Sequence, residues 1–129
     1  MVKNFFPVLP LFSFVLASPI SVHVLNLETG KPSKNVTVVL DKKTSSGWQK
    51  LSQKSTDTNG RINDLFPSGI KFESGAYMVT FQTDEYFSQQ QQKSFFPEVN
   101  IVFQVESTGE HYHIPLLLNK YGYSTYRGN

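Results

Sequence analysis

Apolar and polar side chains alternate with a period of two in a series of short segments along the chain. This alternation is typical of β-strands that pack one face on a core and turn the other to solvent. β-branched and aromatic residues, which favour strands, are frequent in the same segments. The expected strands are residues 20–26, 36–40, 48–52, 76–83, 99–106, 111–117 and 123–127.

Turn residues separate these segments, and one segment departs from the pattern. Asn59-Gly60 is a strong tight-turn signal, so Arg61 is expected to emerge from a sharply defined turn. Residues 84–93 contain no Gly, Pro or β-branched residue and predict one short surface helix with Asp84 as its N-cap. The glutamine run inside this segment is also compatible with a low-complexity linker. Together, seven or eight short strands predict an all-β sandwich in a single domain.

The first seventeen residues have a different character. Lys3 and the amino terminus form a short positive region, and an apolar run follows over residues 5–17 that is too short to cross a bilayer as a helix. This order predicts a secretory signal peptide, residues 1–17, cleaved between Ala17 and Ser18. A frayed apolar tail and an uncleaved anchor are the alternatives. The prediction leaves a mature domain, residues 18–129, that works outside the cytoplasm and not in a membrane.

Composition and missing motifs exclude several classes of function. The chain has no cysteine, which rules out disulfides, zinc–thiolate sites and cysteine nucleophiles. Its net charge is only +2 and its basic residues are scattered, so no nucleic-acid partner is expected. The sequence contains no phosphate-binding loop, no dinucleotide fingerprint and no nucleophile elbow around a serine.

Histidines in strands are the first candidates for chemistry. His111 and His113 lie two residues apart and share one face of a strand, with Tyr112 opposite. Such a pair can hold a metal, although no further cluster of ligands is evident. For each histidine, a structural role with a backbone partner is the alternative.

Three residues with aromatic or guanidinium groups are further candidates. Arg61 is either a surface turn residue near an acidic neighbour or a planar donor that recognises an oxygen-rich or anionic group at two points. Tyr126 and Arg127 either pack at a strand edge or line a site.

Four motifs resemble those of the 5-hydroxyisourate hydrolases, the transthyretin-related proteins of purine breakdown. They are Ser21-Val22-His23-Val24-Leu25-Asn26, Gly60-Arg61, His111-Tyr112-His113-Ile114-Pro115-Leu116-Leu117-Leu118 and Gly122-Tyr123-Ser124-Thr125-Tyr126-Arg127-Gly128. The resemblance covers the chain from Pro19 onwards and, with the signal sequence, is strongest to the bacterial periplasmic members. It implies a transthyretin-like sandwich of two four-stranded sheets and one short helix. It also implies a homotetramer, a dimer of dimers, with active sites at the dimer–dimer interface.

The same resemblance implies an activity and a set of site residues. The family opens the ring of 5-hydroxyisourate in urate degradation, giving 2-oxo-4-hydroxy-4-carboxy-5-ureidoimidazoline, with no cofactor and no metal. His23, Arg61 and His113 match the catalytic trio, and Tyr126 matches a tyrosine that binds substrate together with His23 and Arg61; His111 is not assigned to catalysis. A neutral histidine suits the base role, and Arg61 can stabilise a developing oxyanion. Which of His23 and His113 takes the proton is left open.

Asn129 departs from the family pattern. The family motif ends Tyr-Arg-Gly-Ser, and Asn129 takes the place of this serine, which belongs to the catalytic hydrogen-bond network. An amide keeps an acceptor and adds donors, but it cannot relay a proton as a hydroxyl does. We expect activity equal to or below that of a serine-ended enzyme. The alternative function is a non-catalytic small-ligand carrier, because transthyretin binds hormone on the same fold.

Overall fold

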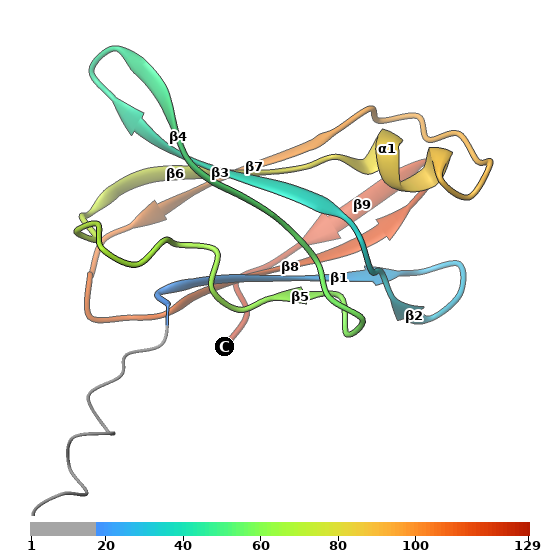
Figure 1. Ribbon diagram of the computed structural model, residues 1–129, viewed down its shortest axis with the longest axis horizontal. Helices are drawn as coiled ribbons and strands as arrows, with labels where there is room; N and C mark the ends of the chain where they lie inside the picture. The colour runs from blue at the N-terminus through green and yellow to red at the C-terminus, as the bar shows by residue number, and fades with distance from the viewer. Residues whose placement is uncertain (1–17) are drawn as a thin grey trace, which may run out of the picture.

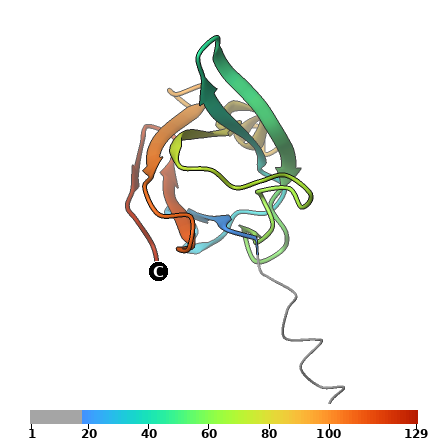
Figure 2. The ribbon, with the colours of Figure 1, turned by 90° about the vertical axis from the view of Figure 1, so that its left-hand side faces the viewer.

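The computed structural model describes residues 18–129, so the predicted signal peptide, residues 1–17, lies outside the described part of the chain. Nine strands form two stacked sheets, and one short helix lies between the sixth and seventh strands in the chain (Figures 1 and 2). The strands are β1 (Ile20–Asn26), β2 (Lys31–Pro32), β3 (Thr37–Thr44), β4 (Gly47–Ser55), β5 (Arg61–Ile62), β6 (Gly75–Phe81), β7 (Val99–Val105), β8 (Tyr112–Asn119) and β9 (Gly122–Thr125), and the helix is α1 (Thr83–Ser88). Between residues 18 and 129, none of the helices has the length and apolar character to span a bilayer.

Strand β1 has three pairing partners in the first sheet. The first sheet has the order β2-β1-β8-β9, and β5 also pairs with β1; the second sheet has the order β4-β3-β6-β7. The β1–β8 pair is parallel, with Ser21 opposite His113, whereas β1 pairs antiparallel with β2 and β5. Through these pairings β1 lies beside two other segments that are far away in sequence.

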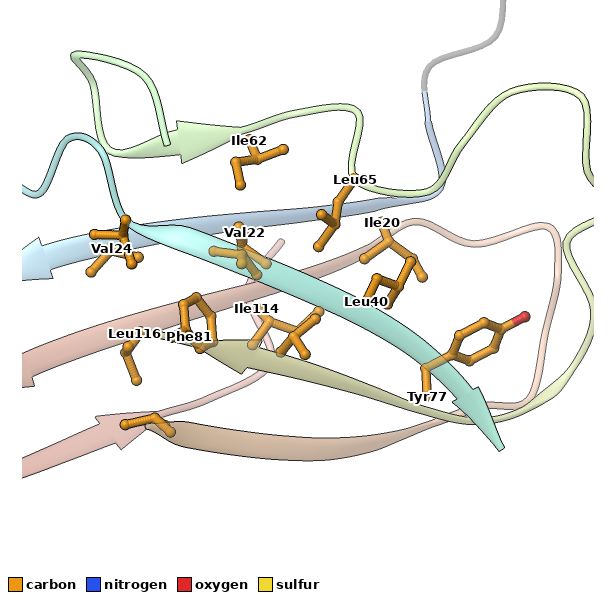
Figure 3. Close-up of a cluster of buried hydrophobic side chains, with 14 of the residues drawn as sticks. Ile20, Val22, Val24, Leu40, Ile62, Leu65, Tyr77, Phe81, Ile114 and Leu116 are labelled. Atoms are coloured by element: carbon orange, nitrogen blue, oxygen red, sulfur yellow. The ribbon is translucent and has the colours of Figure 1, made fainter. Parts of the chain in front are cut away.

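The core lies between the two sheets and follows the predicted alternation. Val22 and Val24 of β1 and Leu116 of β8 meet Leu40 and Phe81 of the second sheet, and all five are fully buried (Figure 3). Because side chains alternate across a strand, the intervening residues of β1 and β8 project from the outer face of the first sheet. The all-β sandwich prediction is confirmed, and the outer face of the first sheet is where the candidate residues lie.

The sheets differ from the expectation in two short strands. β2 and β5 have two residues each and pair along one edge of β1, and neither was predicted as a strand. With β5, the first sheet has five strands, where the resemblance implied four. A strand of two residues is too short to show an alternation of apolar and polar side chains. Its pairing is set by the partner strand and by the turns around it.

The helix is shorter than predicted, and its N-cap was assigned wrongly. The N-cap is Gln82, Asp84 lies in the first turn, and the helix ends at Ser88. The N-cap lies two residues earlier than predicted, and the Thr83 hydroxyl in the first turn donates to the carbonyl of Phe96 at 2.8 Å. The glutamines continue as an exposed turn, in which Gln91 has a positive φ of 54° that ends the helical backbone.

Candidate active site

Arg61 is held opposite His23 by the short pairing of β5 with β1. In the preceding turn, the Asp57 carboxylate accepts hydrogen bonds from the backbone N–H of Asn59 at 2.8 Å and of Arg61 at 3.0 Å. The N–H of Gly60 donates to the carbonyl of Asp57 at 2.9 Å. The tight turn predicted from Asn-Gly is confirmed, and it fixes the backbone from which Arg61 projects.

Gly60 is required by the close approach of this turn to β1. Its φ is +73°, and a Cβ atom would lie 2.5 Å from the backbone oxygen of Val24. The N–H of Val24 donates to the carbonyl of Gly60 at 2.8 Å, so the two backbones are joined at this point. A side chain here would therefore have to push the turn, and Arg61 with it, away from β1.

The parallel β1–β8 pair brings His113 to the same outer face. The imidazole centroids of His23 and His113 are 6.4 Å apart and the rings are inclined by 29°. The hydroxyl oxygen of Ser21 lies 2.6 Å from Nδ1 of His113 and 2.8 Å from Nε2 of His111. His111 and His113 thus share a face, as predicted, and Ser21 bridges them. His23, Arg61 and His113 are brought together from three separate segments.

The terminal motif passes directly against His113. The N–H of Gly128 donates to the His113 carbonyl at 2.9 Å, and a Cβ on Gly128 would lie 2.6 Å from Cδ2 of the His113 ring. Asn129, which follows, is exposed. Tyr126 is 60% exposed and lines a cavity of about 270 Å³ together with His113, although neither His23 nor Arg61 lines this cavity. The chain near its end is therefore in contact with the candidate site.

Arg127 lines the same cavity and also packs at the strand edge. Its guanidinium lies 4.6 Å from the centre of the Tyr112 ring and donates to the Glu110 carboxylate at 2.8 Å. Arg127 thus packs at the strand edge and lines the cavity, so both interpretations of this residue apply.

Burial and nearby positive charge favour the neutral form of the two site histidines. Burial, followed by the charge of Arg61, lowers the pKa of His23 from its ordinary value. Burial is also the largest cause of the lowered pKa of His113, followed by Arg61 and then the other two histidines. Desolvation and like charge both disfavour the imidazolium form. Two neutral imidazoles beside a guanidinium can accept a proton and stabilise negative charge in one place.

The acidic residues near Arg61 form no ion pair with its guanidinium within residues 18–129. Asp57 uses its carboxylate on backbone N–H groups of its own turn, and Asp64 forms an ion pair with Lys54 at 2.9 Å. Among residues 18–129, Arg61 takes part in no ion pair, and it is exposed. Its guanidinium is available for an anionic or oxygen-rich ligand, which was the second of its two interpretations.

Neither a metal site nor a second hollow brings the three candidate residues together within residues 18–129. In the described chain, no group of three or more His, Asp or Glu side chains is placed to hold a metal ion. Nε2 of His111 and Nδ1 of His113 both lie within hydrogen-bond distance of the Ser21 hydroxyl. A larger hollow of about 730 Å³ is lined by His111 and loop residues 66–70, but not by His23, Arg61 or His113.

Two residues of this site were missed from the sequence. Ser21 shares a face of β1 with His23 by simple alternation, so the strand pattern could have drawn attention to it. Gly128 was quoted only as part of a motif, and its contact with the His113 ring depends on how the terminal segment folds back on β8.

Comparison with known proteins points to one family. The sequence profile described as the HIUase/Transthyretin family matches residues 20–128. A 5-hydroxyisourate hydrolase of Salmonella dublin is 47% identical over 110 residues, covering 85% of this chain and 80% of the relative. The structure of Klebsiella pneumoniae 5-hydroxyisourate hydrolase aligns with a TM-score of 0.76 at 32% identity, covering 87% of this chain and 99% of that one. Sea bream transthyretin in complex with thyroxine aligns with a TM-score of 0.79 at 29% identity, covering 85% and 94%.

Proposed function

The chain belongs to the HIUase/Transthyretin family, and we propose that it is a hydrolase that opens the ring of 5-hydroxyisourate in urate degradation. The observation that carries this function is the convergence of His23, Arg61 and His113 on one outer face, through the pairing of β1 with β5 and β8. Neighbouring imidazoles and a guanidinium suit the hydrolysis of a planar cyclic amide rich in oxygen atoms.

The reaction follows from the roles these groups can take. Arg61 binds the oxygens of the substrate, and water attacks a ring carbonyl carbon. One histidine accepts the proton of the water, and Arg61 stabilises the oxyanion that forms. The C–N bond of the ring then breaks as the leaving nitrogen takes up a proton. The pKa of both histidines is lowered, which favours the neutral form that a general base requires.

Two residues of the terminal segment complete the proposed site. Tyr126 contacts the substrate from the cavity that it shares with His113. Asn129, directly after the glycine that packs on the His113 ring, offers amide donors and an acceptor in place of a hydroxyl. Asn129→Ser is expected to leave kcat/KM equal or raise it, and a large fall would show that the amide has a role of its own.

We further propose that the protein assembles as a homotetramer, a dimer of dimers. Exposed apolar side chains support association: Val102 of β7 is 58% exposed, Tyr123 of β9 is 41% exposed, and Tyr121 in the turn before β9 is 74% exposed. The proposed site is also open on the outer face of its sheet, where a second subunit could enclose it. Sedimentation should give the mass of four chains, and a monomer at working concentration would contradict this proposal.

A periplasmic location is proposed from the predicted signal peptide. Lys3 is followed by an apolar run and then by compact residues up to Ala17, and this order is typical of a secretory signal peptide. Expression in a bacterium with an intact secretion pathway should yield periplasmic protein that begins at Ser18. Cytoplasmic protein that retains Met1 would contradict the proposal.

The turnover of freshly made 5-hydroxyisourate tests the proposed function. The substrate is generated from urate with urate oxidase, and its decay is followed by absorbance with and without residues 18–129. Acceleration over the spontaneous decay is expected. The similarity to sea bream transthyretin with thyroxine supports the alternative of a carrier. A carrier would bind 5-hydroxyisourate or an aromatic ligand without changing the rate of decay. That outcome would contradict the hydrolase function and favour the carrier.

A further inference from the structure

Ser21 is a buried hydroxyl that the proposed reaction does not yet use. It is 5% exposed, and its oxygen lies within hydrogen-bond distance of two imidazole nitrogens, Nδ1 of His113 at 2.6 Å and Nε2 of His111 at 2.8 Å. It comes from β1, opposite His113 in the parallel pairing. The serine thus connects a half-buried histidine of the site to an exposed histidine outside it.

The number of hydrogens in this cluster is restricted. A hydroxyl has one hydrogen to donate, so Ser21 can donate to only one of the two imidazole nitrogens. The other nitrogen must carry a hydrogen itself and donate it to the serine oxygen. At least one of Nδ1 of His113 and Nε2 of His111 is therefore protonated, and the tautomers of the two rings are coupled through Ser21.

The coupling determines whether His113 can act as a base. Nδ1 of His113 is occupied by Ser21, so only Nε2 remains for the substrate side. If Ser21 donates to His113, then Nε2 of a neutral ring carries the hydrogen and has no lone pair to accept a proton. If Ser21 donates to His111, then His113 donates from Nδ1 and Nε2 is a free acceptor. The tautomer of an imidazole is set in this way by the bond that its other nitrogen makes.

We propose that Ser21, with His111 as its acceptor, is a positioning residue that holds His113 in the Nδ1–H tautomer and so makes Nε2 of His113 the general base. His111 is suited to this acceptor role because it is exposed and can exchange the hydrogen on its other nitrogen with water. This inference rests on the proposed hydrolase function for its kinetic consequence. The tautomer itself is a property of the free protein.

The matched variants Ser21→Ala and Ser21→Thr test the proposal kinetically. Alanine removes the acceptor for the Nδ1 hydrogen, and threonine restores a hydroxyl at the same position. Ser21→Ala is expected to lower kcat about 10- to 100-fold, as for other groups that orient a functional histidine, with a smaller change in KM. Threonine should recover a large part of this loss. An unchanged kcat in Ser21→Ala would overturn the proposal, as would equal losses in both folded variants.

The tautomer is measured directly by NMR of the imidazole nitrogens in the absence of substrate. The wild-type protein should show a protonated Nδ1 and an unprotonated Nε2 at His113, and Ser21→Ala should lose this preference. His111→Leu, which removes the acceptor, should shift His113 in the same direction, and His111→Gln, which keeps one, should shift it less. A wild-type His113 protonated on Nε2 overturns the inference. Because no turnover is needed, this result is independent of whether 5-hydroxyisourate is the substrate.

Discussion

The two sheets contribute equally to the core but differently to the site. Leu40, Tyr77 and Phe81 of the β4-β3-β6-β7 sheet are fully buried and face Val22 and Val24 of the other sheet, which are equally buried. Only the sheet that contains β1 carries the candidate catalytic side chains on its outer face. Since inner and outer positions are separate, stability and activity should respond to different substitutions.

The site sheet also differs in how its strands meet. In the other sheet, β3, β4, β6 and β7 pair antiparallel over long registers. In the site sheet, β1 has a parallel partner on one side and two very short strands on the other. The short β5 strand relies on its turn for position, so the geometry of Arg61 should be the most sensitive part of the site.

A loss of activity at Arg61 is among the largest expected effects. Arg61→Ala removes the charge that binds the substrate and stabilises the oxyanion, and kcat/KM should fall by about 10²- to 10³-fold or more. The side chain is exposed and forms no ion pair within residues 18–129, so circular dichroism should be unchanged. Arg61→Lys is the control for charge without the planar fork and should recover only part of the loss. Normal turnover in Arg61→Ala would contradict the assignment.

In the opposite sheet, the expected effect is on stability. Phe81 is fully buried, and Phe81→Ala should lower the free energy of unfolding by about 3–5 kcal/mol in urea titrations. The matched control is Phe95→Ala, at a side chain that is 71% exposed, where a change of about 1 kcal/mol or less is expected. The kcat/KM of the folded fraction should stay near wild type in both. A strong loss of activity in folded Phe81→Ala would show that the two sheets are not functionally separate.

Gly60 and Gly30 give a matched test of the turn that carries Arg61. Both have a φ of +73°, but a Cβ on Gly30 meets nothing within 4 Å, whereas on Gly60 it lies 2.5 Å from the Val24 oxygen. Gly30→Ala should cost only the backbone strain of about 1–2 kcal/mol in stability. Gly60→Ala should cost more and also lower kcat/KM, because Arg61 moves. Equal effects of the two substitutions would contradict this role for Gly60.

A smaller effect is expected in the dependence of stability on pH. Because the pKa of His23 and of His113 is lowered in the folded protein from the ordinary value of 6.5, the unfolded chain binds protons first as the pH falls. Stability should therefore decrease as the pH drops below about 6.5 and stop responding to these groups below their folded pKa. His113→Asn should flatten this dependence in urea midpoints between pH 8 and pH 5.5. If the free energy of unfolding rose on acidification in this range, the lowered pKa of these two histidines would be contradicted.

Most of the sandwich could be predicted because its strands are long enough to show alternation. The positions of His23, Arg61 and His113 were predicted from the resemblance to the family, and the tight turn before Arg61 from Asn59-Gly60. The bridging role of Ser21 could not be predicted, since it requires the register of two strands about ninety residues apart in sequence. The start of α1 could not be predicted for a similar reason, because the Thr83 hydroxyl bonds to the carbonyl of Phe96, outside the helix.

The most direct test of the central claim is a double-variant cycle on kcat/KM for 5-hydroxyisourate, with His23→Asn, His113→Asn and the combination. If the β1–β8 pairing joins these two imidazoles in one catalytic unit, each single variant should lose about 10²- to 10⁴-fold. The kcat/KM of the double variant should then be about as low as that of the more impaired single variant, because the effects of groups that act as a unit are not additive. Wild-type turnover in either single variant, or losses that simply multiply in the double, would contradict a shared site.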